Sequence, residues 1–374
     1  MRRSPSRPPL RVWVWIAATL ALVAVAALLW QNSDAAATES TTSAPADVPS
    51  GTPTGDVREA WSAGGDPLPE DVVEDGRVIV GSEHGVRALD VATGEVAWRY
   101  TRSNARLCDV TVTDGVAVAV FRTAGRCDEA VALEVSTGVR AWTRNMSLRG
   151  DAVLGSTASI VLASSPTGVV TFDPRGNNLR WRAGAADGCR FTGAAAGSTG
   201  VAVLERCGGA VRLRLHDGFE GSEHWTVDVA ATDGAEVSLL GADELVGVRF
   251  GDEVRLFAPQ DGGLRATVDG ADRSAGQTAA AGLVLVRAGA VLWAVDPSTG
   301  GTRWSVPVDG LPAAAPAEVG ELVVPATDGF VRLEPRGGLA LGRLPAPGVP
   351  SGGVATVLGP VVVLQLAGEV RGYR

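Results

Sequence analysis

The feature that most constrains the fold is a short motif that returns along the chain. Residues 88–98 have the pattern A-x-D-x-x-T-G-x-x-x-W, inside a stretch from Gly76 to Tyr100 that is typical of three short strands joined by two tight turns. Asp90 can accept hydrogen bonds from the amides that follow it, and Gly94 supplies the positive φ that such a turn needs. Residues 294–304 repeat the whole pattern, and residues 132–142 repeat it with Glu134 in place of the aspartate. A recurring unit of this kind predicts a repeat architecture.

The spacing of the tryptophans indicates how large the repeat is. Trp98, Trp142, Trp181 and Trp225 follow one another at intervals of 44, 39 and 44 residues. After Asp56, no stretch of twelve or more residues has helical apolar spacing, and short Val- and Leu-rich runs alternate with Gly, Asp and Pro turns throughout. A period near 40 residues with several strands in each unit predicts the blades of a β-propeller.

The two ends of the repeat region predict the number of blades. The chain stops at residues 368–374, which align with residues 85–90, so the last unit lacks its outer strand. Residues 57–61 match the outer strand of the first full unit but have no strands before them. The two fragments complete each other, which predicts an all-β, eight-bladed propeller over residues 56–374, closed by a strand at 57–61. Closure of this kind protects strand edges from pairing with other chains.

The motif resembles the tryptophan-docking repeat of the pyrroloquinoline quinone (PQQ)-like propellers, a superfamily that includes dehydrogenases, assembly scaffolds and sensor domains. The resemblance covers residues 56–374 and implies that each indole wedges between neighbouring blades, beside a motif alanine small enough to admit the ring (Ala88, Ala132, Ala294). The tryptophans assigned this structural role are Trp61, Trp98, Trp142, Trp181, Trp225 and Trp304.

The four cysteines fall at similar places in two units. Cys108 and Cys127 are 19 residues apart, and Cys189 and Cys207 are 18 apart. In an antiparallel hairpin the start of the first strand lies beside the end of the second, so each pair is within bonding reach. An even cysteine count in an exported segment favours two disulfides. The alternative, a four-cysteine metal site, lacks C-x-x-C spacing and needs two blades to converge.

The N-terminal region predicts a membrane anchor followed by a tether. Residues 12–30 are uncharged and long enough to cross a bilayer as a helix, and the arginine-rich residues 1–11 predict a cytoplasmic tail. A cleaved signal peptide is the alternative, with Ala35–Ala37 as its small-residue site. Residues 31–55 are rich in Ser, Thr, Ala and Pro and predict a disordered linker. The expected location is the cell membrane, with a single pass and an extracytoplasmic C-terminal domain.

Charge and motif content narrow the function. The formal charge is −9, and residues 31–374 carry 29 arginines against 42 acids, which argues against nucleic acid or an anionic membrane surface as a partner. The chain has no nucleophile elbow, zinc-protease or phosphate-loop motif and no adjacent cysteines of the kind found in PQQ dehydrogenases. His84, His216 and His224 are expected in turns or at the surface. No catalytic, cofactor-binding or metal-binding residue is therefore assigned.

These observations favour a membrane-anchored protein-interaction scaffold or envelope sensor with protein partners in the cell envelope and no catalysis. A quinoprotein-like, PQQ-dependent dehydrogenase and a peptidoglycan- or carbohydrate-binding module are the alternatives. The identity of the partner, the face of the propeller that binds it and the oligomeric state follow from no spacing rule.

Overall fold

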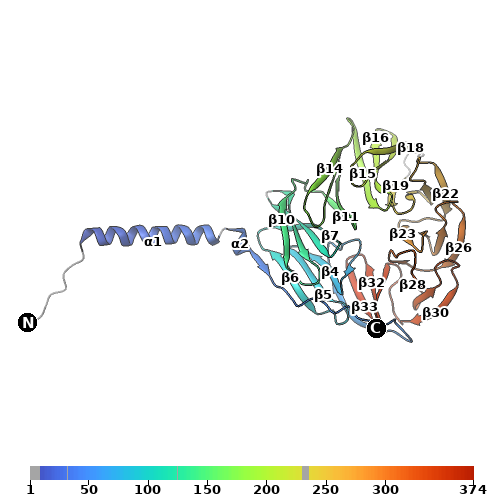
Figure 1. Ribbon diagram of the computed structural model, residues 1–374, viewed down its shortest axis with the longest axis horizontal. Helices are drawn as coiled ribbons and strands as arrows, with labels where there is room; N and C mark the ends of the chain where they lie inside the picture. Colours follow the sequence, from blue (N-terminus) through green and yellow to red (C-terminus); the bar gives the residue numbers. More distant parts are fainter. Residues whose placement is uncertain (1–8, 32, 124, 230–235) are drawn as a thin grey trace, which may run out of the picture.

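The computed structural model describes residues 9–31, 33–123, 125–229 and 236–374, and it forms a disc of eight sheets with one long helix projecting from it (Figure 1). Neighbouring strands within each blade are antiparallel, apart from one short parallel pair in the last blade, and the sheets follow one another around a common axis in chain order. The fold is thus the eight-bladed all-β propeller that the repeats predict. Residues 1–8 of the predicted cytoplasmic tail lie outside the described residues.

The first four blades have four regular strands each, running from the axis to the rim. Blade 1 contains β3 (Val73–Glu74), β4 (Arg77–Ser82), β5 (Gly85–Asp90) and β6 (Val96–Arg102). Blade 2 contains β7 (Arg106–Thr113), β8 (Val116–Thr123), β9 (Arg126–Glu134) and β10 (Arg140–Asn145). Blade 3 contains β11 (Val153–Thr157), β12 (Ile160–Ser165), β13 (Gly168–Phe172) and β14 (Leu179–Gly184). Blade 4 contains β15 (Cys189–Gly197), β16 (Gly200–Cys207), β17 (Ala210–His216) and β18 (Glu223–Val229).

The remaining four blades include two whose rim strands, β22 and β30, contain no tryptophan. Blade 5 contains β19 (Val237–Gly241), β20 (Val246–Phe250), β21 (Glu253–Phe257) and β22 (Leu264–Asp269). Blade 6 contains β23 (Gly276–Ala280), β24 (Leu283–Ala288), β25 (Val291–Val295) and β26 (Thr302–Pro307). Blade 7 contains β28 (Leu322–Ala326), β29 (Gly329–Leu333) and β30 (Ala340–Pro345). Blade 8 contains β31 (Val354–Leu358), β32 (Val361–Leu366) and β33 (Glu369–Tyr373), with β27 (Leu311–Pro312) parallel to β31.

A strand from the start of the chain closes the ring. β2 (Glu59–Gly64) pairs antiparallel with β33, and Trp61 lies opposite Gly372. The closing strand therefore lies slightly later in the chain than the predicted 57–61. Val57 does not belong to it, because its amide donates to the Pro345 carbonyl of blade 7 at 2.9 Å. Closure satisfies the rim edge of β33 with the chain's own backbone.

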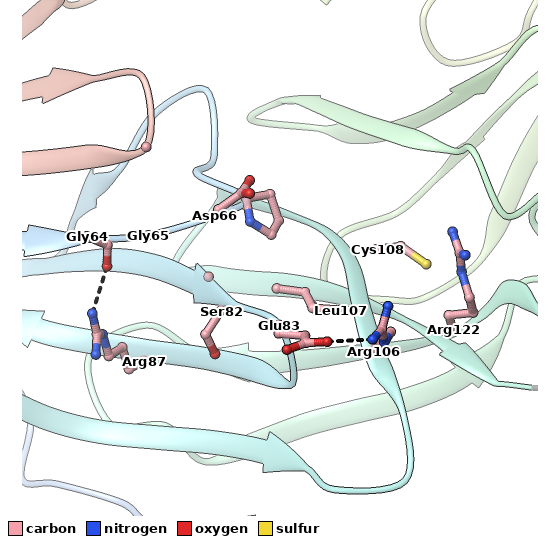
Figure 2. A pocket seen from close by; sticks show the side chains of 13 residues that line it. Gly64, Gly65, Asp66, Ser82, Glu83, Arg87, Arg106, Leu107, Cys108 and Arg122 are labelled. Atoms are coloured by element: carbon pink, nitrogen blue, oxygen red, sulfur yellow. Dashed lines mark hydrogen bonds and ion pairs between the residues drawn. The ribbon is translucent and has the colours of Figure 1, made fainter.

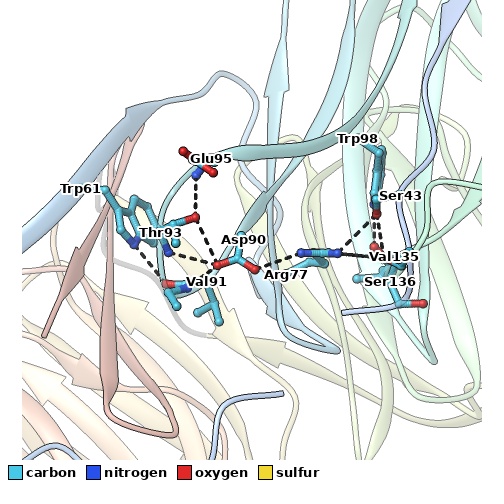
Figure 3. Close-up of polar contacts among 12 residues, drawn as sticks. Ser43, Trp61, Arg77, Asp90, Val91, Thr93, Glu95, Trp98, Val135 and Ser136 are labelled. Atoms are coloured by element: carbon cyan, nitrogen blue, oxygen red, sulfur yellow. Dashed lines mark hydrogen bonds and ion pairs between the residues drawn. The ribbon is translucent and has the colours of Figure 1, made fainter. Parts of the chain in front are cut away.

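A tryptophan of the preceding blade locks six of the eight blade junctions, and Figure 3 shows two of these residues, Trp61 and Trp98. In β2, β10, β14 and β26 the tryptophan is the one buried side chain of the strand, so the rim strand has only this residue to place in the interblade core. Every indole N–H donates to a carbonyl in the turn of the following blade: Trp61 to Val91 (3.0 Å), Trp98 to Val135 (2.7 Å), Trp142 to Pro174 (2.8 Å), Trp181 to Gly218 (3.1 Å), Trp225 to Pro259 (2.8 Å) and Trp304 to Pro335 (2.8 Å).

The motif glycine has a second role that the pattern alone does not reveal. Gly94 and Gly138 have φ of 71° and 75°, as the turn requires. A Cβ at Gly94 would also stand 2.5 Å from the ring of Trp61, and one at Gly138 would stand 2.6 Å from the ring of Trp98. The glycine of one blade is thus the seat for the tryptophan of the blade before it.

The segment after the helix is not the disordered linker that its composition predicts. α1 (Leu10–Gln31) is followed by α2 (Asp34–Ala37) and β1 (Thr38–Ser40), and β1 pairs antiparallel with the rim strand β6. We call residues 34–44 the strap. The strap continues to blade 2, where the Ser43 amide donates to the Thr137 carbonyl at 2.9 Å. Composition failed here because the strap gains backbone hydrogen bonds at an open sheet edge rather than apolar burial.

Candidate functional site

A hollow of the disc lies between blades 8, 1 and 2 (Figure 2). Its volume is about 640 Å³, within the range of pockets that hold small ligands. The walls come from the end of β2, from the turn between β4 and β5, and from β7 and β8. Glycines form part of the wall, which lets a ligand approach the backbone closely. The lining residues that matter below are Arg87, Arg106, Arg122, Asp66 and Glu83.

The charges of this hollow differ from those of the rest of the protein. Arg106 is paired with Glu83 at 2.7 Å. Arg87 donates to the Gly64 carbonyl at 2.7 Å. Arg122 donates to the carbonyl of Gly150, which lies between β10 and β11. Within the described part of the chain, neither Arg87 nor Arg122 has a carboxylate partner. The hollow thus holds three arginines against two acids, in a body whose formal charge is strongly negative.

Both predicted disulfides are present, one of them at this hollow. Cys108, which lines it, is bonded to Cys127, with the two Cα atoms 6.0 Å apart. Cys189 and Cys207 are bonded as direct partners across β15 and β16. The two pairs are not at equivalent places, because Cys127 lies at the start of the third strand of its blade, β9, and not at the end of the second.

The cysteines offer no metal site. Cys189, Cys207 and Glu205 lie close enough together to hold an ion. A sulfur must be a free thiolate to coordinate a metal, and both of these sulfurs are committed to the disulfide. Glu205 is itself engaged, because it accepts a hydrogen bond from the Ala186 amide at 2.9 Å.

A second cavity lies on the central axis and is acidic. It is lined by residues from the inner ends of several blades, among them Glu70, Asp71 and Asp243. Burial, together with the charges of Asp71 and Asp243, raises the pKa of Glu70 to about 7, and burial likewise raises the pKa of Asp71. The side chains of Glu70 and Asp71 keep accessible surface, but the protein that surrounds them in the axial cavity removes much of the bulk water.

The axial cavity does not fit the quinone for which the PQQ-like superfamily is named. PQQ carries three carboxylates and needs cationic partners, whereas the described residues that line this cavity include three acids and no arginine. Arg249 and Arg287, two arginines of the inner blade strands, are engaged elsewhere. Arg249 pairs with Glu236 at 3.2 Å, and Arg287 bonds the Ser274 carbonyl at 2.8 Å.

The three histidines have structural surroundings. His84 bonds the Ala105 carbonyl at 2.7 Å in the turn between β4 and β5. His216 is buried against the Trp181 ring, and burial lowers the pKa of its imidazole. His224 lies at the rim, 3.9 Å from Asp217. None of them lines either cavity described above.

Sequence reasoning missed the arginines of the hollow and the axial acids. They come from different blades, and no spacing rule joins them before the ring closes. One signal was available in the repeats. On the third strand of four blades, an arginine directly precedes the residue that lies opposite the docking-tryptophan position, and these arginines are Arg87, Arg214, Arg255 and Arg371.

Comparisons with known proteins agree with the fold. Residues 22–196 match the model of the PQQ_2 family, described as outer membrane protein assembly factor BamB. The structure is similar to BamB from Moraxella catarrhalis, with 16% identity, a TM-score of 0.54 and coverage of 85% of this chain and 99% of that one. No curated protein sequence matches the chain.

Two further similar structures have different origins. The computationally designed protein Ika8 has a TM-score of 0.59 at 13% identity, covering 86% of this chain and 99% of that one. The quinohemoprotein alcohol dehydrogenase of Comamonas testosteroni has a TM-score of 0.50 at 12% identity, covering 85% and 76%. At these identities the likeness extends to the fold alone.

Proposed function

We propose that this chain, residues 22–196 of which match the PQQ_2 family, is a membrane-anchored scaffold or sensor of the cell envelope that binds protein partners through a face of its disc. The observation that carries this proposal is the strap. The strap joins blade 1 to a helix that is apolar enough to cross a membrane. Because strand β1 of the strap pairs with the rim strand β6, backbone hydrogen bonds hold the disc next to this helix. Propellers that bind partners need such a rigid, presented surface, whereas catalysis needs a reactive centre.

The anchor is α1, with a mean hydropathy of 2.5 over an 18-residue window. By length and composition it can span a bilayer, and the arginines before it favour a cytoplasmic N-terminus. The propeller is then extracytoplasmic. The two disulfides support this location, because disulfides persist in oxidising compartments.

The surfaces of the disc support binding rather than chemistry. The open hollow beside blade 1 presents arginines, and the axial cavity presents carboxyl groups with raised pKa values. Among the described residues, the hydroxyl groups of Ser82 and Ser156, which line the two cavities, bond main-chain or hydroxyl oxygens and not a carboxylate. The family description, an assembly factor, is also that of a protein that acts on other proteins.

Site-specific crosslinking in intact cells tests the proposal. A photoreactive amino acid is placed at Ser82, beside the hollow, or at Arg336, in a turn on the opposite face, and the full-length chain is recovered after illumination. We expect a reproducible envelope protein to be captured at position 82 and not without illumination. If neither position captures a protein, the scaffold function is wrong.

A parallel assay addresses the enzyme alternative. Purified full-length protein is supplied with PQQ, calcium, primary alcohols or aldoses, and a dye that accepts electrons. We expect no quinone to remain bound after gel filtration and no dye reduction that depends on substrate. Stoichiometric quinone binding with turnover would replace the scaffold by a dehydrogenase.

A further inference from the structure

We propose that the hollow between blades 8, 1 and 2 binds an acidic segment of a partner protein that is itself at the membrane, through Arg87, Arg106 and Arg122. This inference rests on the proposed function and deepens it by naming the site and the chemistry of the partner. It stands on three observations: the repeat-equivalent arginines, the charge of the hollow, and the position of the anchor.

The repeats provide an internal comparison for Arg87. The three other arginines at this blade position are neutralised by carboxylates: Arg214 by Glu223 (2.6 Å), Arg255 by Glu253 (2.5 Å) and Arg371 by Glu59 (2.9 Å). Arg87 has only the Gly64 carbonyl, and its Nε is buried without a partner. The arginine at this position forms an ion pair in the other blades, whereas Arg87, which lines the hollow, has no carboxylate partner among the described residues.

Of the three arginines of the hollow, Arg122 is the second that has no carboxylate partner among the described residues, and it lies on the opposite side of the hollow from Arg87 (Figure 2). Arg106 lies between blades 1 and 2, where its partner Glu83 is itself exposed. Acidic side chains of a segment that enters the hollow can therefore bond Arg87 and Arg122 and compete with Glu83 for Arg106. Arginine suits this task, since its planar fork of donors matches a carboxylate.

The anchor joins the disc on the same face as the hollow. Asp34 accepts hydrogen bonds from Arg102 (2.8 Å) and from Asn104 (2.7 Å), in the turn that leads directly to Arg106. Asp34 follows the last residue of α1, Gln31, by three residues, a span of at most about 10 Å. With α1 in the membrane, the hollow lies close to the bilayer surface.

This placement decides which kind of partner fits. A soluble acidic protein meets a surface of the same sign, because the body of the propeller is strongly negative. A segment tethered at the membrane beside α1 is delivered to the arginine hollow at high local concentration. An exposed site of this kind binds through charge, so the affinity falls as salt rises.

Peptide binding to full-length protein in nanodiscs of neutral lipid tests the inference. The probes are a labelled peptide of six glutamates between glycines and the same peptide with six glutamines. We expect the glutamate peptide alone to bind, and the Arg87→Gln/Arg122→Gln double variant to lose about tenfold in affinity, from two partly exposed charge pairs. Arg336→Gln, an exposed arginine on the opposite face, is the matched control and should bind like the wild type. The single Arg122→Gln variant should show part of the loss, and its side chain is exposed, so folding is not at risk.

Several results overturn the inference. These are equal binding of the two peptides, an equal loss in the Arg336 control, or arginine-dependent binding of phosphatidylglycerol vesicles without binding of the glutamate peptide. In cells, unchanged capture of a partner by the double variant at position 82 rejects the acidic-segment site while leaving the scaffold function intact. Loss of partner capture in the double variant supports both the acidic-segment site and the scaffold function.

Discussion

The motif glycine Gly138 of blade 2 packs against the Trp98 ring of blade 1. We therefore expect one methyl group added at Gly138 to destabilise the propeller far more than a methyl group added at a glycine with open space around it. Gly138 has φ 75°, and its Cβ would stand 2.6 Å from Cγ of Trp98. Trp98 is fully buried and donates to the Val135 carbonyl at 2.7 Å. In Gly138→Ala the ring has to move by about 1 Å to reach ordinary contact distance, and this movement breaks the hydrogen bond.

The magnitude follows from three contributions. A non-glycine residue in the left-handed region costs about 1 kcal/mol. Overpacking costs about 1–3 kcal/mol, and the lost hydrogen bond about 1 kcal/mol. We expect Gly138→Ala to lower the free energy of unfolding by roughly 3–5 kcal/mol. Gly282→Ala is the matched control, because Gly282 has φ 72° and nothing within 4 Å of its Cβ; it should lose about 1 kcal/mol.

The assay is thermal unfolding of the full-length protein in detergent, followed by tryptophan fluorescence and calorimetry. The Tm of Gly138→Ala should fall at least twice as far as that of Gly282→Ala. In a Trp98→Phe background the added methyl should cost less, since the smaller ring leaves room. Two results would refute the proposed contact between Gly138 and Trp98. These are equal losses of Tm in the two glycine variants, or an equal effect of Gly138→Ala in the wild-type and Trp98→Phe backgrounds.

Three further outcomes test other parts of the structure. Removing residues 1–50, and with them the strap, should lower the Tm of the propeller relative to removal of residues 1–33, because β6 loses its rim partner; equal melting temperatures would mean that the strap adds no stability. Replacing both Cys189 and Cys207 by serine should lower the stability by about 3 kcal/mol, the chain-entropy value for a loop of this size, as read from denaturant unfolding without reductant. For Glu70, the folded state holds its proton up to about pH 7 while the unfolded chain releases it near 4.5, so stability should fall as pH rises through that window, and Glu70→Gln should flatten the profile of Tm against pH.

The repeat motif determined the fold because its residues act locally. The Asp90 carboxylate accepts hydrogen bonds from the Ala92 and Thr93 amides (3.0 and 3.1 Å), and Gly94 adopts φ 71°, whatever the rest of the chain does. A period near 40 residues and two complementary ends then leave eight blades as the closed solution. The docking tryptophans were also readable, since each lies at a fixed place within its repeat, and the cysteine pairs were readable from their separations of 19 and 18 residues.

The strap was beyond the reach of the sequence. Its Ser- and Thr-rich composition holds little to bury, and its stabilising contacts are hydrogen bonds to strand β6, a rim strand that exists only after blade 1 has formed. The Asp34 contacts with Arg102 and Asn104 join residues about seventy positions apart. Composition reports on apolar burial, whereas an open sheet edge accepts a strand of nearly any composition.

The candidate site was likewise decided by the tertiary structure. Arg87 and Arg122 come from blades 1 and 2, and Gly64, whose carbonyl binds Arg87, comes from the closing strand of blade 8. Glu70 and Asp243 meet only on the axis of the closed ring, where their mutual repulsion and the loss of water raise the pKa of Glu70. Local hydrogen bonds and apolar spacing are written in consecutive residues, so the sequence determined the blades. Charge proximity depends on how distant blades are brought together, so only the closed ring decided the site.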